Sequence, residues 1–211
     1  MNANEYRSGG TDSADQHWSE GETEIMRATY RAMLQHGYAN LSVSKIADEL
    51  GKTKASVYYH YDSKEELLTS FLDFTVDRFK DNFVERTSKD PNTALNDVIE
   101  RLIPLELADE EFHGLVVLLE LRSQASRNEV FRERFTEINE LLVGIVRDII
   151  ERGIETDVFR DVEAARVAEH IVATANGARI DRISTDRAAA PAAVRVALSS
   201  YIDSELRPKN D

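Results

Sequence analysis

Residues 42–68 have the sequence SVSKIADELGKTKASVYYHYDSKEELL, and this stretch decides the fold of the first part of the chain. Ile46, Ala47 and Leu50 are spaced as the apolar face of a short helix. Gly51 then provides a residue that turns the chain without a Cβ penalty. We therefore predict a first helix that ends at Gly51 and a second helix directly after it.

The second helix, predicted over residues 53–61, has two different sides. Val57 and Tyr61 are four residues apart and share the side that we expect to be buried. The opposite side carries hydrogen-bond donors and aromatic rings, namely Lys54, Ser56, Tyr58, Tyr59 and His60. Such groups contact phosphates and base edges. The two helices are typical of a helix-turn-helix, so DNA binding is the leading function.

These residues also resemble a known family. The matching positions are, in order, Ala32-Met33-x3-Gly37-Tyr38, Ser42-x3-Ile46-Ala47-x3-Gly51, Val57-Tyr58-Tyr59-His60-Tyr61 and Ser63-Lys64-Glu65-x-Leu67. In this order they resemble the N-terminal domain of TetR-family transcriptional repressors, which is more specific than an isolated helix-turn-helix pattern. Two residues depart from the family pattern: Lys52 replaces an apolar Val, and Ala55 stands where Gly or Pro is common.

The resemblance assigns DNA contacts to particular residues. We expect Lys54 to read a base, with guanine O6 and N7 as its target. Lys52 either adds a phosphate contact or lies at an exposed turn, and Lys64 is expected to point its ammonium group at phosphate. Ser42 and Thr53 are expected to cap their helices and also to donate to phosphate. The full set of expected DNA-binding residues is Ser42, Lys52, Thr53, Lys54, Ala55, Ser56, Tyr58, Tyr59, His60 and Lys64.

The net charge has the wrong sign for a nucleic-acid-binding protein. It is −13, from 26 Lys and Arg against 39 Asp and Glu, whereas DNA-binding surfaces are basic. The acidic excess lies mainly after Leu67, and the motif itself is close to neutral. An acidic helical adaptor that binds protein without sequence-specific DNA affinity is therefore the alternative function. The acidic, lysine-poor composition also suggests adaptation to high intracellular salt.

Composition excludes several other classes. The 211-residue chain has no cysteine, so neither a disulfide framework nor a thiolate metal site is possible. Its five histidines have no metal-ligand spacing, and no phosphate loop or nucleophile elbow is present. We expect no metal, no cofactor and no enzymatic activity. Without a membrane-length apolar run or a secretion signal, we expect a cytoplasmic protein.

Apolar residues keep helical spacing to the end of the chain, which predicts an all-α protein of about nine helices. Besides the motif pair, the helices are expected over residues 21–36, 63–87, 93–107, 112–125, 128–152, 161–184 and 191–206. Pro104 should kink or end the last turn of the fifth helix, and Gly153 should end the seventh. Asp157 replaces a glycine that is usual in the family's next turn, and Asp tolerates left-handed geometry. The domains are expected to be a disordered arm (1–18), the helix-turn-helix (19–66) and an effector-binding and dimerisation domain (67–211).

The resemblance further implies a homodimer and a small-molecule effector. Small residues are frequent in the last two helices, and they either form the dimer seam or close the subunit's own core. Two-fold symmetry implies a pseudo-palindromic operator, with the reading helices about 34–36 Å apart or somewhat more. An apolar or amphipathic effector is expected among the middle helices, although most of the apolar candidates are better explained as plain core. The candidate effector residues are Phe79, Phe83, Leu102, His113, Leu119, Arg122, Phe135, Asn139, His170 and Asn176.

Overall fold

A computed structural model describes residues 18–84 and 88–207, without the side chains of residue 79 and residues 81–84. Residues 1–17 of the predicted arm and the side chains of Phe79 and Phe83 thus lie outside the described residues, whereas Trp18, its last residue, is described. Within the described part the chain is all-α, with nine α-helices, one short 3-10 helix and no strand, as predicted. The helices are α1 (Glu20–His36), η2 (Tyr38–Asn40), α2 (Val43–Leu50), α3 (Lys54–Tyr58), α4 (Lys64–Val84), α5 (Pro91–Leu102), α6 (Asp109–Gln124), α7 (Glu129–Glu155), α8 (Ala164–Ser184) and α9 (Ala190–Glu205).

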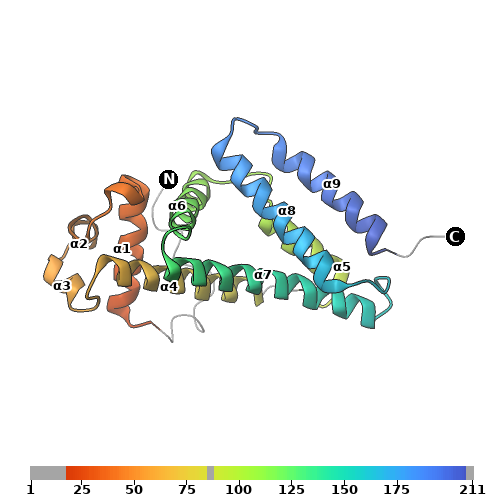
Figure 1. Cartoon of the computed structure of the whole chain (residues 1–211), viewed down its shortest axis with the longest axis horizontal. Coiled ribbons are helices and arrows are strands. Elements are labelled where there is room, and N and C mark those ends of the chain that lie inside the picture. Colours follow the sequence, from red (N-terminus) through yellow and green to blue (C-terminus); the bar gives the residue numbers. More distant parts are fainter. Residues whose placement is uncertain (1–17, 85–87, 208–211) are drawn as a thin grey trace. The chain divides into compact units, whose positions relative to one another are not determined.

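The chain forms two compact units (Figure 1). The first unit comprises Met1–Arg86 and Gln124–Arg134, and the second comprises Thr87–Ser123 and Phe135–Asp211. The expected domain boundary at residue 67 lies inside α4, so that boundary stays a prediction. No helix in the described ranges is long and apolar enough to cross a membrane.

The first unit is built on α1, whose start follows the predicted capping box. Ser19 Oγ accepts from the Glu22 backbone N–H, and the Glu22 carboxylate accepts from the Ser19 backbone N–H. These bonds satisfy two of the amide groups that a helix start leaves without partners. Just before the helix, Trp18 packs edge-on against Phe74 and donates its indole N–H to Asp77. The beginning of α1 is therefore fastened to α4.

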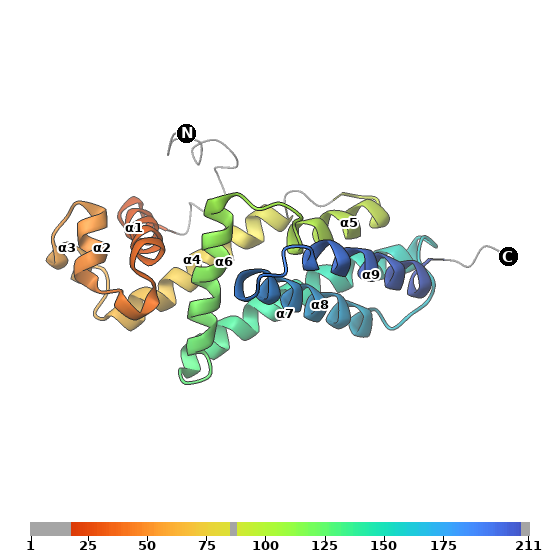
Figure 2. The ribbon, with the colours of Figure 1, turned by 90° about the horizontal axis from the view of Figure 1, so that it is seen from above.

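The second unit contains α8 and α9 side by side, with α5 against α8 (Figure 2). The fifth helix ends at Leu102 and not at residue 107, so the predicted end is wrong. Pro104 explains the difference, because its ring disfavours helical geometry in the preceding residue. The freed carbonyl oxygens of Pro104 and Leu105 accept from the Arg182 guanidinium of α8.

The end of α7 also differs from the prediction. The helix continues through Gly153 to Glu155, so Gly153 does not stop it. A Cβ on Gly153 would lie 2.0 Å from Phe159 Cδ2, and the glycine therefore allows the Phe159 ring to approach the helix backbone. The chain turns at Asp157, which has a left-handed φ of 56°. The predicted tolerance of Asp for this geometry is confirmed.

Candidate nucleic-acid interface

The turn between α2 and α3 is fixed by two caps and one glycine. Ser42 Oγ accepts from the Lys45 backbone N–H at 3.4 Å, and Thr53 Oγ1 accepts from the Ser56 backbone N–H at 3.3 Å. Both predicted caps are thus confirmed. Gly51 has φ 69° and ψ 25°, a left-handed conformation that is strained for residues with a Cβ.

The recognition helix is shorter than predicted. Regular α-helix ends at Tyr58 instead of residue 61. The backbone still makes helix-like hydrogen bonds beyond this point, since the Tyr59 N–H donates to the Ala55 carbonyl at 2.9 Å and the Tyr61 N–H donates to the Val57 carbonyl at 3.1 Å. The next three residues therefore still follow the direction of α3.

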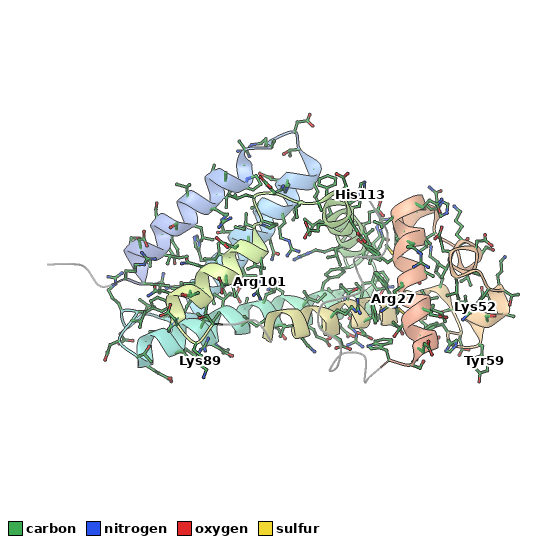
Figure 3. The ribbon with its side chains drawn as sticks, turned by 180° about the vertical axis from the view of Figure 1, so that it is seen from behind. Arg27, Lys52, Tyr59, Lys89, Arg101 and His113 are labelled. Atoms are coloured by element: carbon green, nitrogen blue, oxygen red, sulfur yellow. The ribbon has the colours of Figure 1, made fainter. Side chains whose placement is uncertain are left out.

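Burial separates the two predicted sides of this segment. Val57 and Tyr61 are buried, with 1% and 5% of their surface exposed, whereas Tyr58 and Tyr59 are 50% and 86% exposed. Leu50 is only half-buried, so its place on the apolar face of α2 is marginal. Figure 3 shows Tyr59 projecting from the end of this segment. The remaining exposed residues of the turn and helix are Lys52, Thr53, Lys54, Ala55 and His60, and Ser56 is half-buried.

The three lysines of the expected interface differ in their contacts. Lys54 is exposed and has no ion pair or hydrogen bond from its ammonium group within the described residues. Lys52 Nζ lies 2.6 Å from Glu24 Oε2 of α1, and this bond lowers the pKa of the Glu24 carboxyl. Lys64 Nζ donates to the Leu41 carbonyl oxygen at 2.6 Å. Of these three ammonium groups, only that of Lys54 is uncommitted.

Lys64 also lies over an aromatic ring. Its Nζ is 5.1 Å from the centroid of the Tyr38 ring, a cation–π contact. Burial lowers the pKa of the Lys64 ammonium group. These contacts join the start of α4 to the segment between α1 and α2. A phosphate contact by Lys64 stays a prediction and would compete with its bond to Leu41.

His60 has a packing role that the sequence did not indicate. Its ring lies between those of Tyr59 and Tyr61, with centroid distances of 5.2 and 6.3 Å. A Cβ on Gly21 would lie 3.4 Å from the His60 ring, so the imidazole faces the first turn of α1. In the sequence, only the glycine at position 21 could have indicated this contact. The fold is needed to show that His60 occupies the space beside it.

The candidate effector residues of the second unit fall into two groups. The structure brings Arg122 over the Phe135 ring, 5.8 Å from its centroid, and Asn176 Nδ2 donates to Asn139 Oδ1 at 3.2 Å. It does not bring the two histidines to these residues. His170 is exposed and contacts Tyr201, with 4.3 Å between the ring centroids.

The remaining three candidates have mixed surroundings. His113 is exposed near the start of α6, and its Nδ1 lies 2.6 Å from the Asp109 carbonyl oxygen of the same helix (Figure 3). Leu102 is 2% exposed and belongs to the core of the unit, while Leu119 is half-buried. Sequence reasoning did not include Arg179, which lies on the same face of α8 as Asn176 and one turn later. Its spacing of one helical turn from Asn176 could have identified Arg179 from the sequence. No group of three or more potential metal ligands occurs among the residues described.

Comparison with known proteins fits both units. Residues 25–71 match the family description "Bacterial regulatory proteins, tetR family", and residues 91–207 match "BetI-type transcriptional repressor, C-terminal". The chain belongs to the TetR family of transcriptional regulators. A TetR transcription regulator from Haloarcula marismortui ATCC 43049 has a similar solved structure, with 38% identity and a TM-score of 0.83 over 90% of this chain and 100% of that one.

Two further regulators are similar at lower identity. An HTH-type transcriptional regulator of Mycobacterium tuberculosis (strain ATCC 25618 / H37Rv) is 30% identical over 142 residues, which are 64% of this chain and 66% of the relative. A regulator from Saccharomonospora viridis, solved in complex with choline, shares the fold at 23% identity and a TM-score of 0.79, covering 91% of this chain and 100% of that one. The TetR family consists of DNA-binding regulators and not enzymes, which favours regulation of transcription over the adaptor alternative.

Proposed function

We propose that the protein is a homodimeric repressor that reads a pseudo-palindromic operator with α3 and responds to a small-molecule effector. The observation that carries this proposal is the exposed, uncommitted ammonium group of Lys54 beside Tyr58 and Tyr59, opposite the buried Val57 and Tyr61. This arrangement presents a donor and two aromatic rings to a partner while the helix stays anchored by its other side.

The division of labour among DNA contacts follows from these positions. Lys54 at the first turn of α3 is the proposed base reader, because a lysine donates well to guanine O6 and N7 in the major groove. The hydroxyl groups of Thr53 and Ser42 are already used as caps, and each keeps capacity to donate to phosphate. The proposed backbone contacts are those of Ser42, Lys52, Thr53, Ala55, Ser56, Tyr58, Tyr59, His60 and Lys64.

The proposed dimer seam is the exposed face of α8 and α9. Several small residues of α8 close the subunit's own core, since Ala168, Ala175 and Ala178 are buried within the unit. Others remain exposed, and a Cβ on Gly177 would meet no atom within 4 Å. On α9, Val196 is 69% exposed. An apolar and small-residue face of this kind suits a second copy of the same helix pair.

The effector role rests on the family and on the candidate residues of the second unit. Distant relatives of this fold are described with small molecules, namely choline for the Saccharomonospora viridis regulator and stearoyl-CoA for a FadR regulator from Bacillus subtilis. The latter is 22% identical, with a TM-score of 0.69 over 84% of this chain and 97% of that one. By the same logic an effector here would favour one of two states that differ in operator affinity.

Selection of bound sequences from random duplex DNA tests this function. We would run it at low and at molar KCl, because the acidic composition and the Haloarcula relative support a salt-adapted protein. Recovery of an inverted repeat is the expected result. Val196→Asp is the matched variant. It should sediment as a monomer, and it should no longer select an inverted repeat from the random DNA. Failure of the unaltered protein to enrich any sequence at either salt would refute operator binding.

A further inference from the structure

Three helices of the second unit bring a set of polar and charged side chains together. Arg122 of α6 lies over the Phe135 ring of α7. Asn139 lies one turn after Phe135 on the same face of α7, and it accepts from Asn176 of α8. Arg179 lies one turn after Asn176. These residues form a cluster across α6, α7 and α8, in which Arg122 and Arg179 carry like charges.

Arg179 is the unusual member of this cluster. Its side chain is half-buried, and within the described ranges it has neither a carboxylate nor a hydrogen-bond acceptor. Removal from water and the positive charge of Arg122 both lower the pKa of its guanidinium group, with burial the larger cause. A charge withdrawn from water costs free energy unless a counter-charge or hydrogen bonds compensate for it. Among the described residues, none supplies such compensation to Arg179.

Two other half-buried arginines of the second unit have oxygen partners. Arg182, one turn further along α8, donates to the carbonyl oxygens of Pro104 and Leu105. Arg195 of α9 lies 2.8 Å from the Glu100 carboxylate. Asp181, the acidic residue on α8 that follows Arg179, pairs with Arg187 at 3.0 Å. Arg179 thus differs from Arg182 and Arg195, because within the described residues its guanidinium group has no oxygen partner.

The side of α6 that carries Arg122 also carries three leucines. Leu115, Leu118 and Leu119 precede Arg122 by seven, four and three residues, so they share its helix face. All three are half-buried. Large apolar side chains that keep contact with water gain free energy when a ligand covers them. A charged site thus continues into an apolar surface along one helix.

We propose that Arg179 and Arg122 bind the oxyanion head of an organic effector, a carboxylate or a phosphate monoester, whose apolar body lies along Leu115, Leu118 and Leu119. This assignment rests on the proposed effector response and specifies its ligand class. Arginine suits the task because its planar guanidinium donates two parallel hydrogen bonds to a carboxylate or phosphate. The half-buried amide of Asn139 supplies a further donor. A quaternary ammonium such as choline would instead meet two uncompensated positive charges.

Three ligands with the same tail test the head group: octanoate, octyl phosphate and octyltrimethylammonium. Calorimetric titration of the full chain at fixed ionic strength should detect binding of one or both anions and none of the cation. Arg179→Met should weaken the anion by about 10- to 100-fold, the loss expected for hydrogen bonds to a charged group. Arg187→Gln, an exposed ion-paired arginine just after α8, is the matched control and should leave affinity unchanged.

Thermal unfolding without ligand separates binding from a structural role. Because Arg179 has no partner, Arg179→Met should leave the midpoint unchanged or raise it. A lowered midpoint together with unchanged anion affinity would overturn the proposal, as would equal binding of the three ligands or failure of both anions to bind. Operator binding of the unliganded protein is measured separately by fluorescence anisotropy. Loss of anion affinity with intact operator binding would show that the variant's first unit, which contains the helix-turn-helix, is undamaged. Absent operator binding by the unaltered protein would contradict the proposed function and not the assignment of the anion site.

Discussion

The turn around Gly51 and the junction around Gly153 both depend on glycine, but for different physical reasons. At Gly51 the backbone itself needs the left-handed region, and a Cβ would meet no atom within 4 Å. At Gly153 the backbone is ordinary α-helix, and a Cβ would collide with the Phe159 ring. The first requirement arises from the backbone conformation of Gly51 itself. The second arises from the Phe159 ring, which packs against the helix after the chain has turned.

This difference extends to the two units. In the first unit, which contains the helix-turn-helix and is called the DNA-reading unit below, helix caps join residues three apart. Examples are Ser19 with Glu22 and Thr53 with Ser56. In the second unit, the polar contacts that define the site join distant residues, such as Asn139 with Asn176. Substitutions at these caps should therefore change bonds within one turn of chain, whereas substitutions at Asn139 or Asn176 change a contact between two helices.

The largest effect is expected from Leu121→Ala. Leu121 is fully buried in α6, so the loss of its side chain should lower the free energy of unfolding by about 2–5 kcal/mol. Leu119→Ala, on the same helix but half-buried, should cost roughly half as much or less. Urea unfolding of both variants measures the difference. Equal losses would show that burial does not govern this helix.

Gly153→Ala should destabilise the protein by about 1–3 kcal/mol, because the new methyl group overlaps the Phe159 ring. Gly144→Ala is the matched change in the same helix, where a Cβ meets no atom within 4 Å. It should stabilise the protein by roughly 0.5–1 kcal/mol through helix propensity. Thermal unfolding compares them. If both substitutions were stabilising, the close approach of Phe159 would not explain Gly153.

Lys54→Ala should weaken specific operator binding by about 1–3 kcal/mol and relax one base position. Stability should change little, since the side chain is exposed and unpaired within the described residues. Lys89→Ala serves as the control, because Lys89 is an exposed lysine of the other unit. Fluorescence anisotropy with the selected operator at matched salt measures both variants. Equal affinity of Lys54→Ala and the unaltered protein would contradict the proposed orientation of α3.

The smallest effect is expected from Ser19→Ala, at about 0.5–2 kcal/mol at neutral pH. Hydrogen bonds from Ser19 hold the pKa of Glu22 below its ordinary value of 4.5. The carboxylate therefore contributes stability above pH 4.5, and this contribution is lost as the pH falls through the lower, folded-state pKa. The difference between variant and unaltered protein should shrink in acid.

Urea unfolding at neutral pH and below pH 4.5 measures this dependence. Ser184→Ala is its control, because Ser184 Oγ is exposed and donates to the Ile180 carbonyl of its own helix. A constant difference between Ser19→Ala and the unaltered protein across this range would exclude the Glu22 carboxylate as the cause.

The sequence predicts those features of the DNA-reading unit that depend on residues close together in the chain. The caps at Ser42 and Thr53, the turn at Gly51 and the buried pair Val57 and Tyr61 all require only neighbouring residues. The bonds of Lys52 and Lys64 were not predictable in this way. Their acceptors lie 28 and 23 residues away in the chain, and no periodic pattern indicates such a partner.

In the second unit the sequence identifies the helices but not their ends or their unpaired groups. The end of α5 depends on how strongly Pro104 acts on the residue before it, and the end of α7 depends on Phe159. Arg122, Phe135, Asn139 and Asn176 were among the candidates, and the structure brings them together as two pairs, while their effector role stays a prediction. Arg179 was missed, because the absence of a counter-charge becomes visible only after every nearby carboxylate has been located.

The attachment of Trp18 to Phe74 and Asp77 has a practical consequence, because Trp18 is the chain's single tryptophan. The tryptophan fluorescence of the protein therefore originates from one place, the contact between the start of α1 and the middle of α4. The emission maximum and quenching by iodide report the packing of that contact without any added dye. An effector that loosens α4 from α1 would redden the emission, and a stopped-flow trace would give the rate at which the signal reaches the DNA-reading unit.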